Sequence, residues 1–161
     1  MSKPQVGAPA PTFEADTDRG ARVSLDQLRG GVVVLYFYPE DDTPGCTKQA
    51  CSIRDSWSEF ERQGIALYGV SPDSVESHVK FRDKFGLPFP LLADPDRTIC
   101  EAYGVWVEKK NYGKTYMGVE RSAFVIDADG VLAAEKRRIK PDHTVEWALD
   151  QAGRLGAAAP G

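Results

Sequence analysis

The feature that most restricts the fold is the uninterrupted run GVVVLYFYP at residues 31–39. Its β-branched and aromatic residues follow one another without a polar break, which is typical of a strand covered on both faces. Similar runs occur at 65–73, 89–94 and 122–130, and the last ends in the turn signal Asp-Ala-Asp-Gly before VLAAEKRRI at 131–139. We therefore expect a central sheet with a hairpin late in the chain.

Segments with helical periodicity separate these strands. From Cys46 onward, apolar or small residues recur in steps of four and three, which predicts one helix face with a stop at Gly64. Further helices are expected over 74–86, 94–104 and 142–153. The last would begin at Asp142 as its cap and stop at Gly153. Strands that alternate with helices of this length indicate βαβ units, a largely parallel sheet and an α/β fold.

The composition agrees with one globular domain. The chain has 161 residues, 42% hydrophobic and 27% charged, and no repeat or long linker divides it. We expect a single domain over 1–161 with loose ends at 1–4 and 155–161. A net charge of −4 with scattered basic residues argues against binding to nucleic acid or an anionic membrane.

The sequence also predicts a cytoplasmic location. No stretch is apolar over the roughly 20 residues that a membrane-spanning helix needs, and the N-terminus lacks the apolar core of a secretion signal. Thiols in the cytoplasm are normally kept reduced. The three cysteines are then either small buried side chains or sites of chemistry, not a disulfide framework.

Cys46 follows the turn sequence DDTPG and lies at the start of the first predicted helix. Asp42 or Thr43 would cap this helix, and Pro44 would occupy its first position. Unpaired N–H groups and the positive end of the helix dipole favour a thiolate in the first turn. The preceding strand delivers the turn to the carboxyl edge of the sheet, where α/β folds bind ligands. An inert buried cysteine is the alternative, but the context favours chemistry.

Ionisation alone does not explain fast thiol chemistry. An ordinary thiol is already several per cent ionised at neutral pH, so complete ionisation raises its rate only about ten- to a hundredfold. Donors aimed at the oxygens of the transition state are therefore needed. The Thr43 hydroxyl, the backbone N–H of Cys46 and a guanidinium from elsewhere in the chain are candidates.

Cys51 stands five positions after Cys46, a spacing that keeps their Cα atoms roughly 8–9 Å apart on a regular helix. A disulfide generally needs less than about 7 Å, so the two sulfurs can join only if the first helical turns unwind. A Cys46 sulfenic acid could condense with Cys51, and the strained disulfide would be easy to reduce.

Two other interpretations of the cysteine pair are open. The spacing could be an accident of packing, or the cysteines could belong to a zinc site. Zinc is the weaker alternative, because His78 and His143 are isolated and no C-x₂-C pair exists. We expect both histidines at the surface or at helix ends.

The pattern Pro-x-x-x-Thr-x-x-Cys, formed by Pro39, Thr43 and Cys46, resembles the active-site motif of the peroxiredoxins. Cys51 matches the resolving cysteine of the bacterioferritin comigratory protein, or Q-type, branch. Arg121 in GVERSAFVID matches the active-site arginine of the family. This similarity extends over most of the chain.

The resemblance implies a thioredoxin-like fold, with a central mostly parallel sheet flanked by helices, and an atypical 2-Cys peroxidase. Cys46 would attack the peroxide O–O bond, Thr43 and Arg121 would bind the peroxide oxygens, and Pro39 would exclude water. Cys51 would resolve the sulfenic acid as an intramolecular disulfide. Thioredoxin or a similar dithiol protein would reduce that disulfide.

The resemblance further implies hydrogen peroxide and alkyl hydroperoxides as substrates, with no metal or organic cofactor. We expect a monomer, because resolution needs no second subunit. Many members of the branch have a lysine where Glu40 stands and an acidic residue where Gln49 stands, and either change could alter thiol reactivity or peroxide preference. Cys100 is expected in the core, although a backup resolving role stays open.

Two other classes of function remain as alternatives. A non-enzymatic redox sensor could use the same disulfide switch, and a peroxide rate no faster than that of a free thiol would favour it. A disulfide oxidoreductase of the thioredoxin type is disfavoured because the chain lacks C-x-x-C. We assign Tyr36, Trp57, Phe60 and Trp147 to the core, and we expect a polar loop over 106–120.

Overall fold

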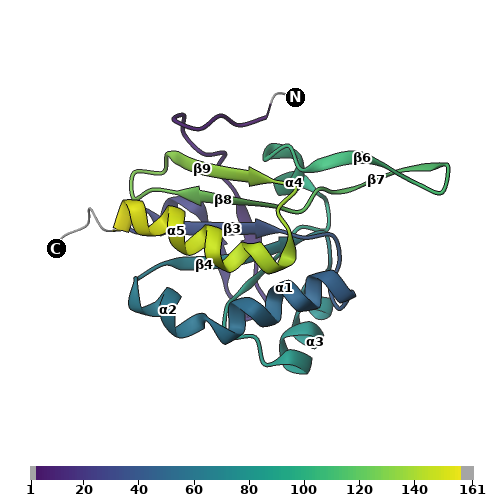
Figure 1. The fold of residues 1–161 in the computed structure, drawn as a ribbon, viewed down its shortest axis with the longest axis horizontal. Helices are drawn as coiled ribbons and strands as arrows, with labels where there is room; N and C mark the ends of the chain where they lie inside the picture. Colours follow the sequence, from purple (N-terminus) through teal and green to yellow (C-terminus); the bar gives the residue numbers. More distant parts are fainter. Residues whose placement is uncertain (1–2, 157–161) are drawn as a thin grey trace.

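The computed structural model describes residues 3–156 and has a five-stranded sheet at its centre, in the order β5-β4-β3-β8-β9 (Figure 1). The strands are β3 (Val33–Phe37), β4 (Ala66–Ser71), β5 (Leu91–Ala93), β8 (Ser122–Ile126) and β9 (Leu132–Arg137). β3 pairs in parallel with β4, and β4 with β5, whereas β8 is antiparallel to both β3 and β9. Every strand except β8 therefore points the same way, although the pairings are mixed.

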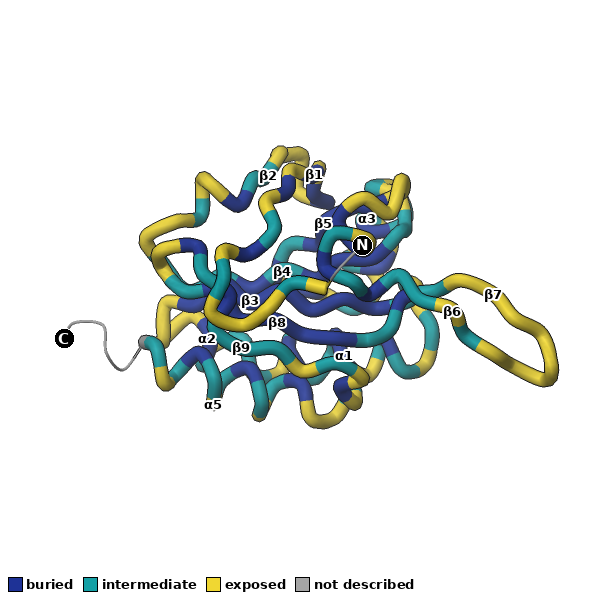
Figure 2. The backbone as a smooth tube through the Cα atoms, turned by 90° about the horizontal axis from the view of Figure 1, so that it is seen from above, coloured by how far each residue is buried: buried dark blue, intermediate teal, exposed yellow. Residues whose placement is uncertain are grey.

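Helices cover both faces of this sheet. They are α1 (Pro44–Asp55), α2 (Trp57–Arg62), α3 (Val75–Phe85), α4 (Thr98–Ala102) and α5 (Thr144–Gly156), with the short 3₁₀ helices η1 (Leu25–Leu28) and η2 (Pro141–His143). Two hairpins lie outside the central sheet: β1 (Glu14–Asp16) with β2 (Arg22–Ser24), and β6 (Trp106–Asn111) with β7 (Lys114–Val119). The second hairpin projects from the body and is largely exposed (Figure 2).

The continuous apolar run of β3 is explained by burial on both faces. Val34 and Tyr36 pack in one core with side chains of α1, α2 and α5. Leu35 and Phe37, which alternate with them, pack in a second core that includes Phe13 and side chains of α4. Every residue of β3 is buried (Figure 2), so the prediction of a strand covered on both faces is confirmed.

The other predicted strands also form, including the late hairpin of β8 and β9. Tyr36 and Phe60 are fully buried, and Trp57 and Trp147 are partly buried against the same core. Within residues 3–156, no helix is long and apolar enough to cross a membrane.

The long helix predicted from Cys46 to Gly64 is interrupted. The backbone of Ser56, at φ −110° and ψ 12°, leaves the helical conformation and separates α1 from α2. The helix expected from Asp94 begins only at Thr98, because both carboxylate oxygens of Asp94 accept backbone N–H groups from the first turn of α4. The helical periodicity is therefore correct, but the boundaries are not.

Two further expectations are wrong. The segment 106–120 is a hairpin and not a loop, because Tyr112 (φ 51°) and Gly113 (φ 79°) form a tight two-residue turn with positive φ. Gly153 lies inside α5, where packing of the helix outweighs the preference of glycine for a helix end. Of the chain ends expected to be loose, residues 155 and 156 belong to α5, and residues 1–2 and 157–161 lie outside the described residues.

Candidate active site

The register of the central sheet determines which side chains meet at its edge. β3 and β8 run antiparallel with Phe37 opposite Ser122. The loop that leaves the carboxyl end of β3 therefore lies beside the residue that enters β8, which is Arg121. Residues about 80 positions apart in the sequence are brought together by this single pairing.

The start of α1 has the predicted form. Thr43 is its N-cap in extended conformation (φ −96°, ψ 156°), and Pro44 is the first helical residue. Asp42 has a left-handed backbone (φ 59°), which turns the chain from the strand into the helix. The Thr43 hydroxyl does not cap the helix; it donates to the carbonyl of Glu40 at 3.0 Å.

Cys46 lies in the first turn of α1 with a guanidinium against its sulfur. Nη2 of Arg121 is 3.4 Å from Cys46 Sγ, within hydrogen-bonding distance for sulfur. The residue is only 2% exposed, so the thiol is more enclosed than its expected place at the carboxyl edge of the sheet suggests. This contact supplies the guanidinium donor expected beside the sulfur, and it comes from Arg121, the residue that the resemblance matched.

The second arm of the same guanidinium is held by α1. Nη1 of Arg121 donates to Oε1 of Gln49 at 2.6 Å, and Nε2 of Gln49 donates to Thr144 Oγ1 at 2.8 Å. Gln49 and Thr144 are both fully buried. Because Gln49 is neutral, Arg121 has no carboxylate partner in this arrangement. Sequence reasoning missed Thr144, since no local motif connects it with a residue 95 positions earlier.

Two of the other predicted site residues precede Cys46 in the chain. Thr43 and Pro39 lie in the loop between β3 and α1, and both are half-buried. Thr43 thus shares the start of α1 with Cys46. The action of Thr43 or Pro39 on a peroxide stays a prediction. Glu40 is exposed in the same loop.

Asp41 anchors the loop between β3 and α1 through hydrogen bonds. Its carboxylate accepts hydrogen bonds from Tyr38 Oη at 2.6 Å, Ser77 Oγ at 2.7 Å and His78 Nδ1 at 2.7 Å. Its backbone N–H donates to Asp73 at 2.8 Å. The loop carrying Pro39 and Thr43 is therefore tied to the start of α3.

His78 is fully buried, so it is not a surface histidine, but it lies near the start of α3, as the helix-end alternative expects. Its Nδ1 faces the Asp41 carboxylate, and its Nε2 faces the Leu92 carbonyl at 3.0 Å. The Leu92 carbonyl can only accept, so Nε2 donates to it, and an ionised Asp41 carboxylate favours a second proton on Nδ1. Burial lowers the pKa of His78, but the Asp41 carboxylate and the Leu92 carbonyl outweigh burial, and the pKa is raised.

Ligand atoms of Asp41, Asp73 and His78 lie within 4.8 Å of one another, a spacing that could hold a metal ion. The Asp41 carboxylate, however, already accepts three hydrogen bonds from protein side chains. The arrangement therefore fits a hydrogen-bonded anchor better than a metal site.

Residues 6–135 match the sequence model of the AhpC/TSA family. The chain belongs to the AhpC/TSA family. This AhpC/TSA protein is 51% identical over 143 residues to the putative peroxiredoxin bcp of Coxiella burnetii, covering 88% of this chain and 95% of that relative. It is 49% identical over 143 residues to peroxiredoxin Bcp of Bacillus subtilis, covering 88% and 91%.

The fold of this AhpC/TSA protein has close counterparts among solved structures. Peroxiredoxin Q of Xanthomonas campestris superimposes with a TM-score of 0.87 at 34% identity, covering 94% of this chain and 98% of that one. A structure of the bacterioferritin comigratory protein of the same organism, which addresses alkyl peroxide reduction, gives a TM-score of 0.87 at 33% identity and covers 94% and 99%. The resemblance to this branch and the thioredoxin-like fold are confirmed: the chain is a peroxiredoxin, a peroxide-reducing enzyme.

Cys51 and Cys100 have different surroundings in the peroxiredoxin. Cys51 lies on the same continuous helix as Cys46 and is partly exposed, and all three cysteines are free thiols. Cys100 is fully buried in the core on the opposite face of the sheet from Cys46, which confirms its assignment to the core. Burial and the nearby Asp94 carboxylate raise the pKa of Cys100 well above the ordinary thiol value.

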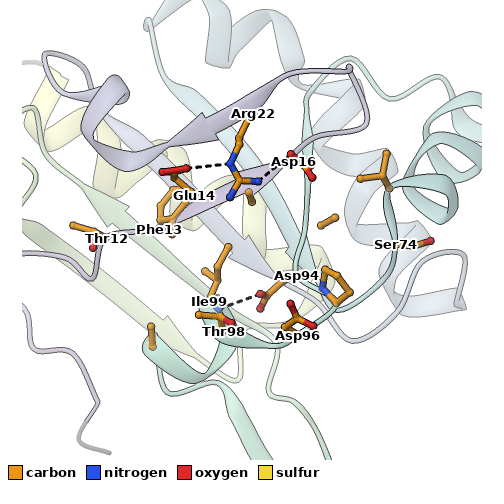
Figure 3. Close-up of a pocket in the computed structure, with 15 residues that line it drawn as sticks. Thr12, Phe13, Glu14, Asp16, Arg22, Ser74, Asp94, Asp96, Thr98 and Ile99 are labelled. Atoms are coloured by element: carbon orange, nitrogen blue, oxygen red, sulfur yellow. Dashed lines mark hydrogen bonds and ion pairs between the residues drawn. The ribbon is translucent and has the colours of Figure 1, made fainter.

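The cavity drawn in Figure 3 is separate from this site in the peroxiredoxin. It has a volume of about 440 Å³ and is bordered by the β1–β2 hairpin and the start of α4. Above it, Arg22 bridges Glu14 and Asp16 at 3.0 Å each (Figure 3). Neither Cys46 nor Arg121 lines this cavity, so it is not the place where a peroxide would meet the thiol.

Proposed function

We propose that this peroxiredoxin reduces hydrogen peroxide and alkyl hydroperoxides through a Cys46 sulfenic acid, which Cys51 resolves as an intramolecular disulfide. Thioredoxin or a similar dithiol protein then reduces the disulfide. The observation that carries the proposal is the 3.4 Å contact between Arg121 Nη2 and the sulfur of Cys46 in the first turn of α1. The similar Xanthomonas protein, whose structure addresses alkyl peroxide reduction, supports the substrate class.

In the first step, the Cys46 thiolate attacks one peroxide oxygen. The S–O bond forms as the O–O bond breaks, and the leaving oxygen takes up a proton to become water or an alcohol. Negative charge moves from sulfur to the leaving oxygen, so fixed donors around the two oxygens lower the barrier. Arg121 supplies such donors, and the Thr43 hydroxyl can turn from Glu40 toward the bound peroxide.

In the second step, the sulfur of Cys51 attacks the sulfur of the sulfenic acid. The S–S bond forms, the S–O bond breaks, and the hydroxide leaves as water with the proton of the Cys51 thiol. Both cysteines lie within α1, which is a regular helix from Pro44 to Asp55. The first turns of α1 must therefore unwind before the sulfurs can meet. A dithiol partner then exchanges with the strained disulfide.

Resolution within one helix supports a monomeric enzyme, and dependence on a dithiol reductant supports a reducing compartment such as the cytoplasm. Within the proposal, residues 1–161 act as one domain and need no metal or organic cofactor. Sedimentation equilibrium of the reduced and oxidised protein tests the monomer, and a dimer in either state would contradict it.

Three cysteine variants test the reaction scheme. We expect Cys46→Ser to abolish turnover, and Cys51→Ser to consume about one peroxide per subunit and then stall with thioredoxin as the only reductant. Cys100→Ser is the matched control and should turn over like the wild type. Undiminished thioredoxin-driven turnover of Cys51→Ser would refute the resolving role. If peroxide oxidised Cys46 no faster than it oxidises a free thiol, the proposed peroxidase activity would be refuted.

A further inference from the structure

The buried side chain of Gln49 lies inside the segment that must unwind. It stands between Cys46 and Cys51 on α1 and is fully buried. Its amide makes two hydrogen bonds, to Arg121 at 2.6 Å and to Thr144 at 2.8 Å. A side chain between the two cysteines is thus joined to the residue that touches the reactive sulfur and to a residue of α5.

The direction of these hydrogen bonds is fixed by chemistry. Thr144 Oγ1 is 3.0 Å from the carbonyl of Lys140, which can only accept, so the Thr144 hydroxyl must donate to it. The Thr144 oxygen is then free to accept from the amide nitrogen of Gln49. Arg121 can only donate, so it requires the amide oxygen of Gln49. Both neighbours of Gln49 therefore select the same orientation of the amide.

Thr144 lies outside the unwinding segment, on a helix that packs against both the central sheet and α1. It begins α5, whose residues Ala148 and Ala152 pack in the core against the central sheet. When residues 46–51 unwind, Gln49 must withdraw from Arg121 and Thr144. A buried donor or acceptor left without a partner is costly, so this contact opposes the unwinding.

We propose that Thr144 is a positioning residue of this peroxiredoxin: through Gln49 it holds Arg121 against Cys46 before oxidation and retains α1 in its wound form until the disulfide forms. The inference rests on the proposed Cys46–Cys51 disulfide. It predicts opposite effects on the two chemical steps. Loss of the Thr144 hydroxyl slows attack on peroxide, because Arg121 is less well held, and accelerates disulfide formation, because α1 unwinds more easily.

The test compares three variants in single-turnover reactions. Thr144→Val removes the hydroxyl and keeps the shape, whereas Thr144→Ser keeps the hydroxyl. Thr17→Val is the matched control, since Thr17 is also buried and its hydroxyl also donates to a backbone carbonyl, that of Ala21 at 3.0 Å, away from the site. Reduced protein is mixed with one equivalent of hydrogen peroxide and quenched at intervals. Mass spectrometry then follows the thiol, sulfenic acid and disulfide.

We expect Thr144→Val to form the disulfide from the sulfenic acid about tenfold faster than the wild type, which corresponds to about 1.4 kcal/mol, and to consume its thiol more slowly. Thr144→Ser and Thr17→Val should keep both wild-type rates. Disulfide formation within twofold of the wild type in Thr144→Val, or equal acceleration in Thr17→Val, would overturn the proposal.

A second variant covers the case in which Thr144→Val does not fold. Gln49→Met removes both hydrogen bonds at similar length, and it should likewise accelerate disulfide formation; an unchanged or slower step overturns the proposal. If the wild type forms the Cys46–Cys51 disulfide and the variants form it at the same rate, only the role of Thr144 is refuted. A wild-type protein that forms no such disulfide refutes the proposed function.

Discussion

Replacing Arg121 tests the electrostatics of the site most sharply. Its Nη2 is 3.4 Å from the sulfur of Cys46, and two unit charges at that separation interact by about 5 kcal/mol at an effective dielectric constant of 20. Arg121 is partly exposed, which reduces this value. Only the part of the interaction that grows as charge moves onto the leaving oxygen accelerates the reaction.

Removal of one preorganised donor typically costs about 10²–10³ in rate. We therefore expect Arg121→Met to lower the second-order rate constant for hydrogen peroxide by about two orders of magnitude, or about 3 kcal/mol. Arg121→Lys should recover part of the loss, because it restores a charge but not the two-armed contact with Cys46 and Gln49.

The assay is stopped-flow oxidation of the reduced protein, followed by tryptophan fluorescence at several peroxide concentrations. Alkylation by iodoacetamide serves as the control reaction, because it needs the thiolate but no donors for peroxide oxygens. The peroxide rate should fall much further than the alkylation rate. A loss below fivefold, or equal losses in both reactions, would show that Arg121 does not act on the oxygens.

The remaining predictions concern residues around this contact. Because the pKa of His78 is raised in the folded state, its pair with Asp41 stabilises the protein fully below about pH 6.5 and loses that effect as the pH rises through the raised pKa. The free energy of unfolding of His78→Ala, measured by urea titration, should thus fall furthest below the wild type near pH 6, by about 3–5 kcal/mol. An equal deficit at pH 6 and at high pH would contradict the charged pair. In Gly45→Ala, the new Cβ would lie 3.1 Å from Arg121 Nη2, so the rate of peroxide oxidation in stopped flow should fall. The melting temperature should stay level or rise, since alanine favours the helix by up to about 1 kcal/mol. An unchanged oxidation rate would refute the contact. Cys100→Ala should leave peroxide turnover unchanged, and Cys100 should be alkylated only on unfolding, whereas rapid labelling of the native protein would contradict its burial.

Local sequence patterns predict much of this fold. The unbroken apolar run of β3 and the turn signal after β8 reflect burial and backbone geometry that are encoded within a few residues. The start of α1 is equally local, because Thr43 and Pro44 favour a helix N-terminus and place Cys46 in its first turn. The spacing of Cys51 from Cys46 makes it a candidate partner, and its resolving role stays a prediction from the resemblance.

The parts that sequence patterns miss depend on long-range contacts. Arg121 has no local sign of function and becomes a candidate only through resemblance, since it meets Cys46 by the pairing of β3 with β8. Thr144 and His78 carry no local signal either: one is reached through Gln49 and the other through Asp41. The late start of α4 has a local cause instead, because the side chain of Asp94 accepts backbone N–H groups five and six residues ahead and replaces the helix with a capped turn.

Hydrogen exchange read by mass spectrometry tests the central claim most directly: that peroxide oxidises the sulfur at the start of α1 and that this helix must then unwind. The reduced protein is compared with protein oxidised by one equivalent of hydrogen peroxide. The account predicts a Cys46–Cys51 disulfide together with lost amide protection over residues 44–51, while β3 and α5 stay protected. A disulfide between these cysteines with α1 still fully protected, or oxidation without that disulfide, would contradict it.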